Sequence, residues 1–349
     1  MRFPRSLSLV LVALTLLLSF VPVGAQGETV EKVGIVTPAS RTNQAWDQQG
    51  VDNLTAVGEK LGVEVEVAEN AGYEDITPIL QDMSDDGAQM IVCHASGYQT
   101  VCPEFAQSSG VPVVVIENPG AVTEGLISDI ETQAQEAAYL AGVLAGHETN
   151  TGTVAIVTTG EPPTWNFMTI GFAEGLKAAN PEAKLVYTVV GEAAYDDAPG
   201  AKRSTEAALA AGADIVFGMG DGASFGMIQA IREFNEGKQP EQQARFIDVI
   251  GDKSKSEAKD FLLTSVLFDY TGAYTKMIED LEKGSFGSIY TMNVENKGVR
   301  LLDYPIEVKP ESKKAVEEAT TGIVDGTIKV SVIGDAKGMH KRLDELFPK

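Results

Sequence analysis

The sequence predicts an α/β protein built from two doubly wound lobes. Apolar, strand-like runs alternate with segments of helical periodicity along nearly the whole chain. These runs do not alternate strictly between apolar and polar residues, which is typical of parallel strands buried on both faces. The runs form two series of about four, and a chain of 349 residues is too long for one ordinary core. A repeated βα pattern in two lobes accounts for all three observations.

The elements follow in order. The first series is KVGIV, VEVEVA, QMIVCH and VPVVVIE, and the second is TVAIVTT, KLVYTVV, ADIVFGM and RFIDVIG. The break falls near GHETNTG, residues 146–152, and helical periodicity is clear over 132–146 and 167–179. FLLTSVLFDY, an amphipathic helix over 271–283, the runs IYTMNV and VRLLDY, and a tail helix complete the chain.

A late strand and helix that return to the first lobe predict several interlobe crossings, a hinge, and a ligand cleft at the carboxyl ends of two sheets. We expect residues 26–147 plus about 269–286 to form the N-terminal lobe. Residues 148–268 plus about 287–349 are expected to form the C-terminal lobe.

The first 25 residues have the pattern of a secretory signal peptide. Arg2 and Arg5 precede the apolar stretch LSLVLVALTLLLSF, and VPVGAQ supplies small residues for cleavage after Ala25. An uncleaved membrane anchor is the alternative. No Cys lies near the cleavage region, so the sequence does not support a bacterial lipid anchor. We therefore expect an exported, periplasmic or extracellular protein.

Composition excludes some classes of partner. The formal net charge of −23 makes nucleic acid and anionic membrane surfaces poor partners. Cys93 and Cys102 can form a disulfide in an oxidising compartment, but the spacing leaves the pairing open. The two Cys and three scattered His give no metal-site spacing, so we expect no metal or other cofactor.

Catalytic motifs give no support for an enzyme. The sequence contains neither HExxH nor a Walker loop. The glycine-rich GMGDGASFG, residues 218–226, lies between a strand and a helix without GxGxxG spacing. We interpret it as a turn that brings backbone amides and Asp221 to a ligand. A phosphate cradle, or a tight turn that binds nothing, is the alternative.

Aromatic, amide and carboxylate side chains recur where the predicted strands end. Because open α/β sheets bind ligands at the carboxyl ends of their strands, these residues indicate a pocket for a flat, neutral or cationic polar molecule. The candidates are Ser96, Tyr98, Trp165, Asn166, Asp221, Phe225, Asp252, Phe268 and Asp269.

The first helix carries a further candidate near its start. Its core stripe includes Val51 and Leu54, and at about 100° per residue Trp46 lies about 80° from Leu54. Trp46 is therefore poorly placed for the core, and we expect it to face the cleft. Asn43 serves equally well as a helix N-cap or a ligand contact, and Asp47 is favoured there by the helix dipole in either case.

Four stretches together resemble a known family. They are YLAGVLAG (139–146), TWNFMTIGFAEGLKAANP (164–181), AGADIVFGMGDGASFGMIQAI (211–231) and LLTSVLFDY (262–270). In order and spacing they are similar to the basic membrane protein (BMP) family of ABC-transporter solute-binding proteins, which is related to bacterial purine nucleoside receptors. The resemblance implies a type I periplasmic-binding-protein fold with three hinge crossings. It also implies capture of purine nucleosides or bases for delivery to a membrane permease and ATPase. We expect the protein to be a monomer.

The resemblance also assigns roles to residues. Trp46 would stack on the base, with Asn43 and Asp47 as hydrogen-bond partners. Gly220, Asp221 and Phe225 would come from the glycine-rich strand end, with Phe225 a second stacking face. Asp252 falls near the family's carboxylate for ribose hydroxyls.

Two departures from the family pattern affect the ligand. The family often has an Asp after the first strand, where this chain has Thr37, Pro38 and Ala39. Nucleoside-binding members commonly have a Lys after the LTS-containing strand, where this chain has Phe268 and Asp269. A free base such as adenine is therefore an alternative ligand. A sugar or signal-molecule receptor, and a secreted nucleoside hydrolase using Asp221, Asp252 and Asp269, are alternative functions.

Overall fold

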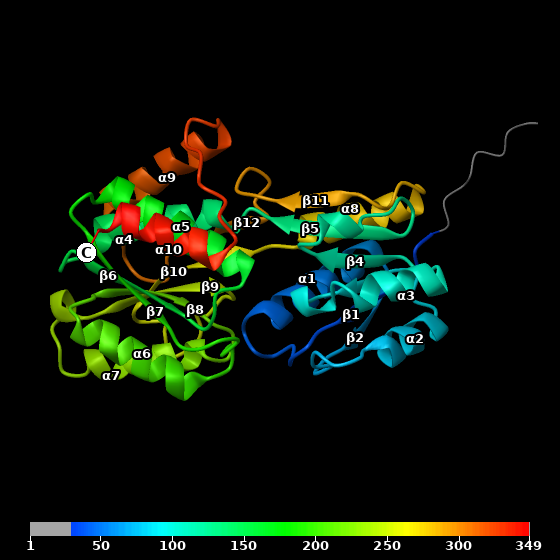
Figure 1. Cartoon of the computed structure of the whole chain (residues 1–349), viewed down its shortest axis with the longest axis horizontal. Coiled ribbons are helices and arrows are strands. Elements are labelled where there is room, and N and C mark those ends of the chain that lie inside the picture. The colour runs from blue at the N-terminus through cyan, green and yellow to red at the C-terminus, as the bar shows by residue number, and fades with distance from the viewer. Residues whose placement is uncertain (1–28, 349) are drawn as a thin grey trace, which may run out of the picture.

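The structure, a computed structural model, describes residues 29–348 and consists of two lobes, each built on a six-stranded sheet (Figure 1). The first sheet has the order β2-β1-β3-β4-β5-β11 and the second β7-β6-β8-β9-β10-β12. Every neighbouring pair is parallel except β10 and β12. The predicted α/β fold with two doubly wound lobes is thus confirmed.

The bounds of the elements divide by lobe. The first lobe contains β1 (Lys32–Val36), α1 (Trp46–Leu61), β2 (Glu64–Ala68), α2 (Thr77–Asp85), β3 (Ile91–Cys93), α3 (Val101–Ser109), β4 (Val113–Ile116), β5 (Ile127–Thr132), α8 (Thr271–Glu282) and β11 (Ile289–Met292). The second lobe contains α4 (Ala134–Glu148), β6 (Thr153–Thr158), α5 (Pro163–Ala179), β7 (Lys184–Val189), α6 (Ala198–Ala210), β8 (Ile215–Met219), α7 (Ser224–Asn235), β9 (Arg245–Ile250), β10 (Leu262–Phe268), β12 (Val299–Leu301), α9 (Pro310–Val324) and α10 (Ala336–Leu346).

Central strands are apolar because both of their faces are covered. All residues of β4, β8 and β10 are buried. Apolar clusters lie on both sides of the first sheet, one containing side chains of α1 and α8 and the other side chains of α2 and α3. The non-alternating apolar runs therefore indicated the correct class of sheet.

The chain crosses between the lobes three times. It passes from β5 to α4, from β10 to α8, and from β11 to β12. At the second crossing, the side-chain oxygen of Asn53 in α1 accepts a hydrogen bond from the backbone N–H of Tyr270 at 2.7 Å. Three crossings side by side form a hinge about which the lobes can rotate.

Two expected lobe boundaries differ from the structure. Helix α4, expected within the first lobe, packs against α5, α9 and β10 of the second, so the first crossing precedes α4 instead of following it near residue 147. Strand β11 pairs with β5 in the first sheet, so the returning segment continues past 286 to Met292. In both cases tertiary packing determines to which lobe the element belongs, and the periodicity of the sequence does not encode that packing.

Helices α4 and α5 approach one another unusually closely because glycines line their contact. A Cβ added to Gly142, Gly171 or Gly175 would lie 2.0–2.2 Å from a backbone oxygen of the facing helix. Real Cβ atoms essentially never come closer than 3.0 Å. The glycines of YLAGVLAG and TIGFAEG therefore serve helix packing and anchor the segment that leaves the first crossing.

Between residues 29 and 348, no helix combines the length and apolar character needed to cross a membrane. The predicted signal peptide, residues 1–25, lies outside the described residues.

Candidate ligand-binding site

A cavity of about 440 Å³ lies between the lobes, within the ~300–1,000 Å³ usual for small-molecule sites. Its walls come from segments that follow the carboxyl ends of strands in both sheets, where open α/β sheets bind ligands. The lining residues are Pro38, Ala39, Trp46, Asp47, Tyr73, Ala95, Ser96, Gly97, Ile116, Glu117, Pro162, Thr164, Trp165, Ala193, Tyr195, Asp196, Asp221 and Ile250.

Trp46 is the first residue of α1 and lines this cavity. His94 stacks on its indole ring, with ring centroids 4.8 Å apart. The indole N–H donates to the carbonyl of His94 at 3.1 Å, and His94 Nε2 lies 2.9 Å from the Trp46 carbonyl oxygen. Phe268 and Tyr270 meet the indole edge-on at 6.1 and 6.2 Å. These contacts fix the ring in one orientation.

His94 supports Trp46 as a neutral side chain. It is fully buried beside β3, and burial lowers its pKa to about 4. A neutral imidazole can donate from Nε2 to the Trp46 carbonyl while it stacks beneath the indole. His94 therefore adds no positive charge near the cavity at neutral pH.

Other aromatic rings surround the cavity. Trp165, at the start of α5, meets Tyr195 edge-on with centroids 5.1 Å apart. Tyr73, which follows β2 and is 62% exposed, lies 6.1 Å from the ring of Tyr98. The Tyr98 hydroxyl donates to the carbonyl of Gly72 at 2.6 Å and so holds the segment that carries Tyr73.

Asp47 lines the first-lobe wall and is held by donors on either side. It accepts hydrogen bonds from the Ala39 N–H at 3.1 Å and the Asn43 amide at 2.7 Å. Burial raises its pKa, and these two bonds oppose that effect. Asn43 itself does not line the cavity. It also accepts from the N–H of Ala45, the N-cap residue of α1, so it organises the start of the helix and positions Asp47.

Glu117 joins the two lobes across the cavity. It follows β4, and its carboxylate accepts from the Thr132 hydroxyl at 2.5 Å and from the hydroxyl of Thr164 in α5 of the other lobe. Burial raises the pKa of Glu117, and the two hydroxyls oppose this effect. A carboxylate at the N-terminus of α5 is also favoured by the helix dipole.

A second contact between the lobes is made by the residue that follows β9 in the second lobe, just as Glu117 follows β4 in the first. Strand β9 holds the place in its sheet that β4 holds in the first, and Gly251 follows it. A Cβ on Gly251 would lie 1.8 Å from the Gln44 carbonyl oxygen, just before α1. The end of one strand in each lobe thus touches the start of a helix of the other lobe, α5 or α1, and the lobes are in contact.

The backbone is strained at the cavity. Glu117, Ala193 and Ile250 have φ angles of 54°, 51° and 69°, a region that side-chain-bearing residues rarely adopt. For the β-branched Ile250 the conformation is especially unfavourable. Such strain is concentrated at functional sites in proteins, and it is consistent with a binding role for this cavity.

Asp221 and Asp196 provide the carboxylates of the second-lobe wall. Burial raises the pKa of Asp221 to about 7, the charge of Asp47 adds to the shift, and Lys253 opposes it. Trp46, at the start of α1, and Asp221 line the same cavity, and the Trp46 backbone N–H lowers the Asp221 pKa. Asp196 accepts from the Gly222 N–H at 3.1 Å.

Removing the Asp221 charge should stabilise the ligand-free protein at alkaline pH. Because the folded-state pKa lies above the unfolded value, ionisation disfavours folding as pH rises through about 7. We expect Asp221→Asn to raise the free energy of unfolding by roughly 2 kcal/mol at pH 8, with the gain shrinking towards pH 4. Urea unfolding at both pH values measures this. An equal effect at the two values would contradict the assignment.

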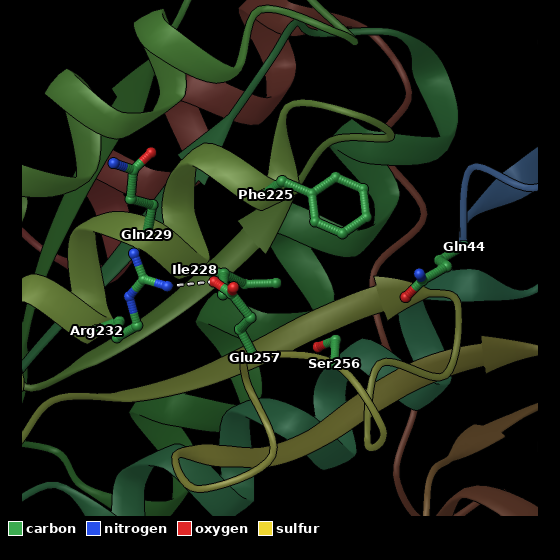
Figure 2. Close-up of a pocket in the computed structure, with 7 residues that line it drawn as sticks. All are labelled: Gln44, Phe225, Ile228, Gln229, Arg232, Ser256 and Glu257. Carbon is green, nitrogen blue, oxygen red and sulfur yellow. Dashed lines mark hydrogen bonds and ion pairs between the residues drawn. The ribbon is translucent and has the colours of Figure 1, made fainter.

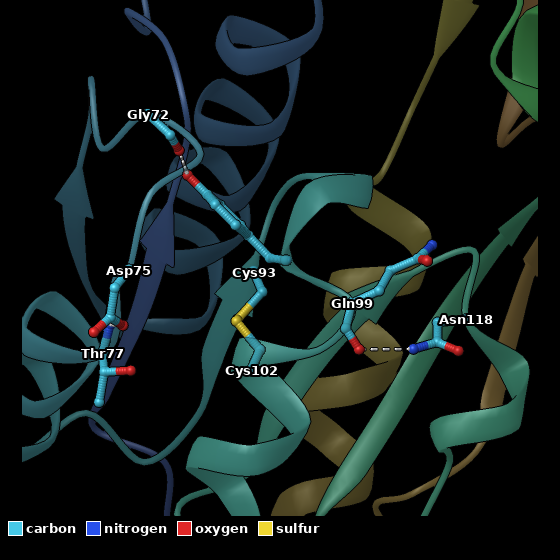
Figure 3. The surroundings of a disulfide bond; sticks show 8 residues. Gly72, Asp75, Thr77, Cys93, Gln99, Cys102 and Asn118 are labelled. Carbon is cyan, nitrogen blue, oxygen red and sulfur yellow. Dashed lines mark hydrogen bonds between the residues drawn. A yellow bond between two sulfur atoms is a disulfide. The ribbon is translucent and has the colours of Figure 1, made fainter.

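Cys93 and Cys102 form a disulfide with a Cα–Cα distance of 6.6 Å, which resolves the pairing that the sequence left open (Figure 3). The closed loop contains Ser96 and Gly97 of the cavity wall. Beside it, the amide of Asn118 donates to the Gln99 carbonyl at 3.1 Å. The disulfide thus fixes the segment between β3 and α3.

Removing the disulfide should destabilise the protein and loosen this wall. For a loop of this length, we expect the Cys93→Ala/Cys102→Ala variant to lose roughly 2–3 kcal/mol of unfolding free energy. Chemical unfolding measures the loss, and reduction of the wild type should produce a similar one. An unchanged midpoint in both experiments would refute this role.

The cavity lining includes five of the predicted ligand-binding residues, namely Trp46, Asp47, Ser96, Trp165 and Asp221. Others lie behind the lining. Asn166 donates to the carbonyls of Glu161 and Gly334, and Phe268 is fully buried against Trp46. Gly220 is buried and packs against Thr159. With Asn43 and Tyr98, these residues position the wall.

Three predicted residues lie elsewhere. Phe225, the second residue of α7, lies in a separate pocket with Arg232 and Glu257 (Figure 2). Asp252 is exposed and accepts from the Ser254 N–H. Asp269 accepts from the N–H and hydroxyl of Thr271 at the start of α8. Because these groups turn to local helix and loop contacts, the structure does not bring Asp221, Asp252 and Asp269 together as a hydrolase would require.

Several lining residues were missed in the sequence, including Tyr73, Glu117, Thr164, Tyr195 and Asp196. All follow the carboxyl end of a strand, so the strand-end rule applied to β2, β4 and β7 as well would have found most of them.

One catalytic motif was missed in the sequence: GASFG, 222–226, fits the spacing of a GxSxG nucleophile elbow and follows a strand. Ser224, however, is fully buried and its hydroxyl donates to the Asp221 carbonyl at 2.7 Å. This hydrogen bond stabilises the start of α7, and the buried hydroxyl is not available as a nucleophile. Among residues 29–348, no group of three or more His, Cys, Asp or Glu side chains is arranged to hold a metal.

Solved structures of other proteins share this two-lobe architecture. ABC transporter solute-binding proteins from Aeropyrum pernix and Conexibacter woesei have TM-scores of 0.75 and 0.72, with 20% and 16% identity. The alignments cover 91% and 88% of this chain, and 97% and 100% of theirs. This likeness confirms the predicted type I periplasmic-binding-protein fold.

Curated relatives are similar over most of their length. The ABC transporter nucleoside-binding protein BmpA of Lactococcus lactis is 26% identical over 321 residues, covering 86% of this chain and 88% of BmpA. The transcriptional activator protein med of Bacillus subtilis is 25% identical over 257 residues, covering 73% of this chain and 76% of med. Residues 30–333 match the family described as ABC transporter substrate-binding protein PnrA-like. The chain belongs to this Bmp family of substrate-binding proteins, as the four sequence stretches indicated.

Proposed function

We propose that this protein is the extracytoplasmic receptor of an ABC importer and captures a purine nucleoside or a free purine base. The observation that carries the proposal is the position of Trp46, whose indole is fixed by His94 and lines an interlobe cavity together with carboxylates of both lobes. The nucleoside-binding relative supports the same class of ligand.

The lining suits a flat ring with polar edges. One face of Trp46 is covered by His94, so the base would stack on the other face. Asp47 and Asp221 would accept hydrogen bonds from amino groups, ring N–H groups or ribose hydroxyls. Phe268 is buried behind Trp46 and offers no donor to a ribose, which keeps the free base as an alternative.

Capture would proceed by closure about the three-crossing hinge. A ligand that contacts Trp46 and Asp47 of one lobe and Trp165 and Asp221 of the other binds the closed form more tightly than the open form. Glu117 and Thr164 would add a direct contact between the lobes on closure. The ligand would thereby shift the population to a closed form that a membrane permease and its ATPase can recognise.

The protein would act as an exported monomer without a cofactor, delivered by the signal peptide. A sugar or signal-molecule receptor remains the second candidate because aromatic rings also stack on sugars. The third candidate is a nucleoside hydrolase. Such an enzyme would cleave the nucleoside to a free base and ribose during incubation, and analysis of the products would detect this cleavage.

A thermal-shift screen of purine bases, nucleosides and sugars tests the proposal. We expect adenosine, guanosine or a free purine to raise the melting temperature by several degrees through preferential binding to the folded state. Pyrimidines and sugars should have smaller effects. No response to any purine, or a response to sugars alone, would eliminate the purine assignment.

A further inference from the structure

The charge of the cavity is one-sided. Asp47, Glu117, Asp196 and Asp221 all line it, and none of the described lining residues is Lys, Arg or His. Asp47 is buried and Glu117 and Asp221 are half-buried, so these carboxylates repel each other in the absence of a counter-charge, whereas Asp196 is exposed to solvent. The charge on Asp47 already raises the pKa of Asp221.

Lys253, whose charge acts on Asp221, is itself paired with another carboxylate. Lys253 follows β9, is fully buried, and forms an ion pair with the equally buried Asp248. His94 is neutral behind Trp46, as described above. The described lining residues therefore supply no cation, and Lys253 behind them offsets the charge of Asp221 only in part.

Two of the four carboxylates have protein donors on both sides, and two have oxygens left for a solute. Asp47 and Glu117 each accept two hydrogen bonds from protein groups. Asp196 accepts from the Gly222 N–H alone among the described residues. Asp221 receives no side-chain hydrogen bond from residues 29–348, although its carboxylate lies near the Trp46 N–H.

Four aromatic rings also line the cavity. Trp46, Tyr73, Trp165 and Tyr195 come from both lobes and line the same cavity. The faces of such rings attract cations as well as stacked bases. Aromatic rings combined with unpaired carboxylates are the features that recognise an organic cation.

We propose that the solute carries a positive charge, and that Asp196 and Asp221 are the specificity-determining residues that select it over a neutral or anionic molecule of the same shape. The inference rests on the proposed function, since it describes a cationic purine nucleoside or base in the same cavity. The cation replaces the missing counter-charge when the lobes close, so neutral nucleosides bind more weakly and phosphorylated ones are rejected.

A charge series on one scaffold tests the inference. Adenosine is compared with 5′-amino-5′-deoxyadenosine and 1-methyladenosine, which carry a cation at opposite ends of the molecule, and with adenosine 5′-monophosphate. Affinities are measured by titration calorimetry in 150 mM NaCl. At this salt concentration the Debye length is roughly 8 Å, so charges on the distant protein surface are screened. We expect at least one cationic probe to bind about tenfold more tightly than adenosine, and the monophosphate at least tenfold more weakly.

Two variants locate the effect. Asp221→Asn and Asp196→Asn should each reduce the preference for the cation several-fold, while Asp252→Asn removes an exposed strand-end charge outside the cavity and should leave it unchanged. Equal affinities across the charge series, or an effect of Asp252→Asn equal to that of Asp221→Asn, overturn the charge selection and leave the purine assignment standing. Binding of no member of the series overturns both.

Discussion

Replacing Trp46 with alanine is expected to weaken purine binding by about 5- to 150-fold, which corresponds to the ~1–3 kcal/mol that an aromatic platform contributes to the stacking of one base. The mutation removes the ring surface that lines the cavity. It also leaves His94, Phe268 and Tyr270 without their shared contact. Titration calorimetry with adenosine or guanosine measures the loss.

Two matched variants separate stacking from disruption of the wall. Trp46→Phe keeps an aromatic face but loses the indole N–H bond to His94, so an intermediate loss is expected. Phe225→Ala removes an exposed ring from a pocket outside the cavity and should leave affinity unchanged. If Phe225→Ala weakened binding as much as Trp46→Ala, the stacking residue would have been placed in the wrong pocket.

Replacing Gly175 with alanine is expected to cost roughly 2–4 kcal/mol of unfolding free energy. The new Cβ would lie 2.0 Å from the Tyr139 carbonyl oxygen, so α4 and α5 would have to separate by about 1 Å along their contact. Because α4 follows the first crossing, the change should also disturb the hinge. Urea unfolding measures the destabilisation.

Gly272→Ala in α8 is the matched control, because nothing lies within 4 Å of its added Cβ. There the lower entropy of the unfolded chain should leave stability unchanged or slightly raised. Equal midpoints for the Gly175 and Gly272 variants would show that the two helices can separate without cost.

The sequence predicted the fold well where the physics is local or periodic. Apolar runs without alternation identified the parallel strands. The angular position of Trp46 on its helix predicted that it lies off the core stripe, and in the structure Trp46 lines the cavity. The lobe boundaries were harder to predict from the sequence, because the lobe to which α4 and β11 belong depends on the elements against which they pack. An amphipathic pattern says that a helix packs, without saying against which lobe.

The cavity was predicted in part for a similar reason. The strand-end rule locates segments, whereas a side chain's direction depends on the local turn. Asp221 lines the cavity and Phe225, four residues later, lines the separate pocket of Figure 2, since α7 begins between them. Glu117 and Tyr195 lie in loops without periodicity, where the approach of the opposite lobe gives them their role.

A crystal structure of the protein with adenosine tests the central claim most directly. Protein that has been unfolded in guanidinium chloride and refolded, to remove any retained ligand, is crystallised with the nucleoside in excess. We predict a base stacked on Trp46 between the two lobes, with its polar edge at Asp47 or Asp221. Adenosine in the Phe225 pocket, or a saturated crystal with an unoccupied interlobe cavity, would contradict the account.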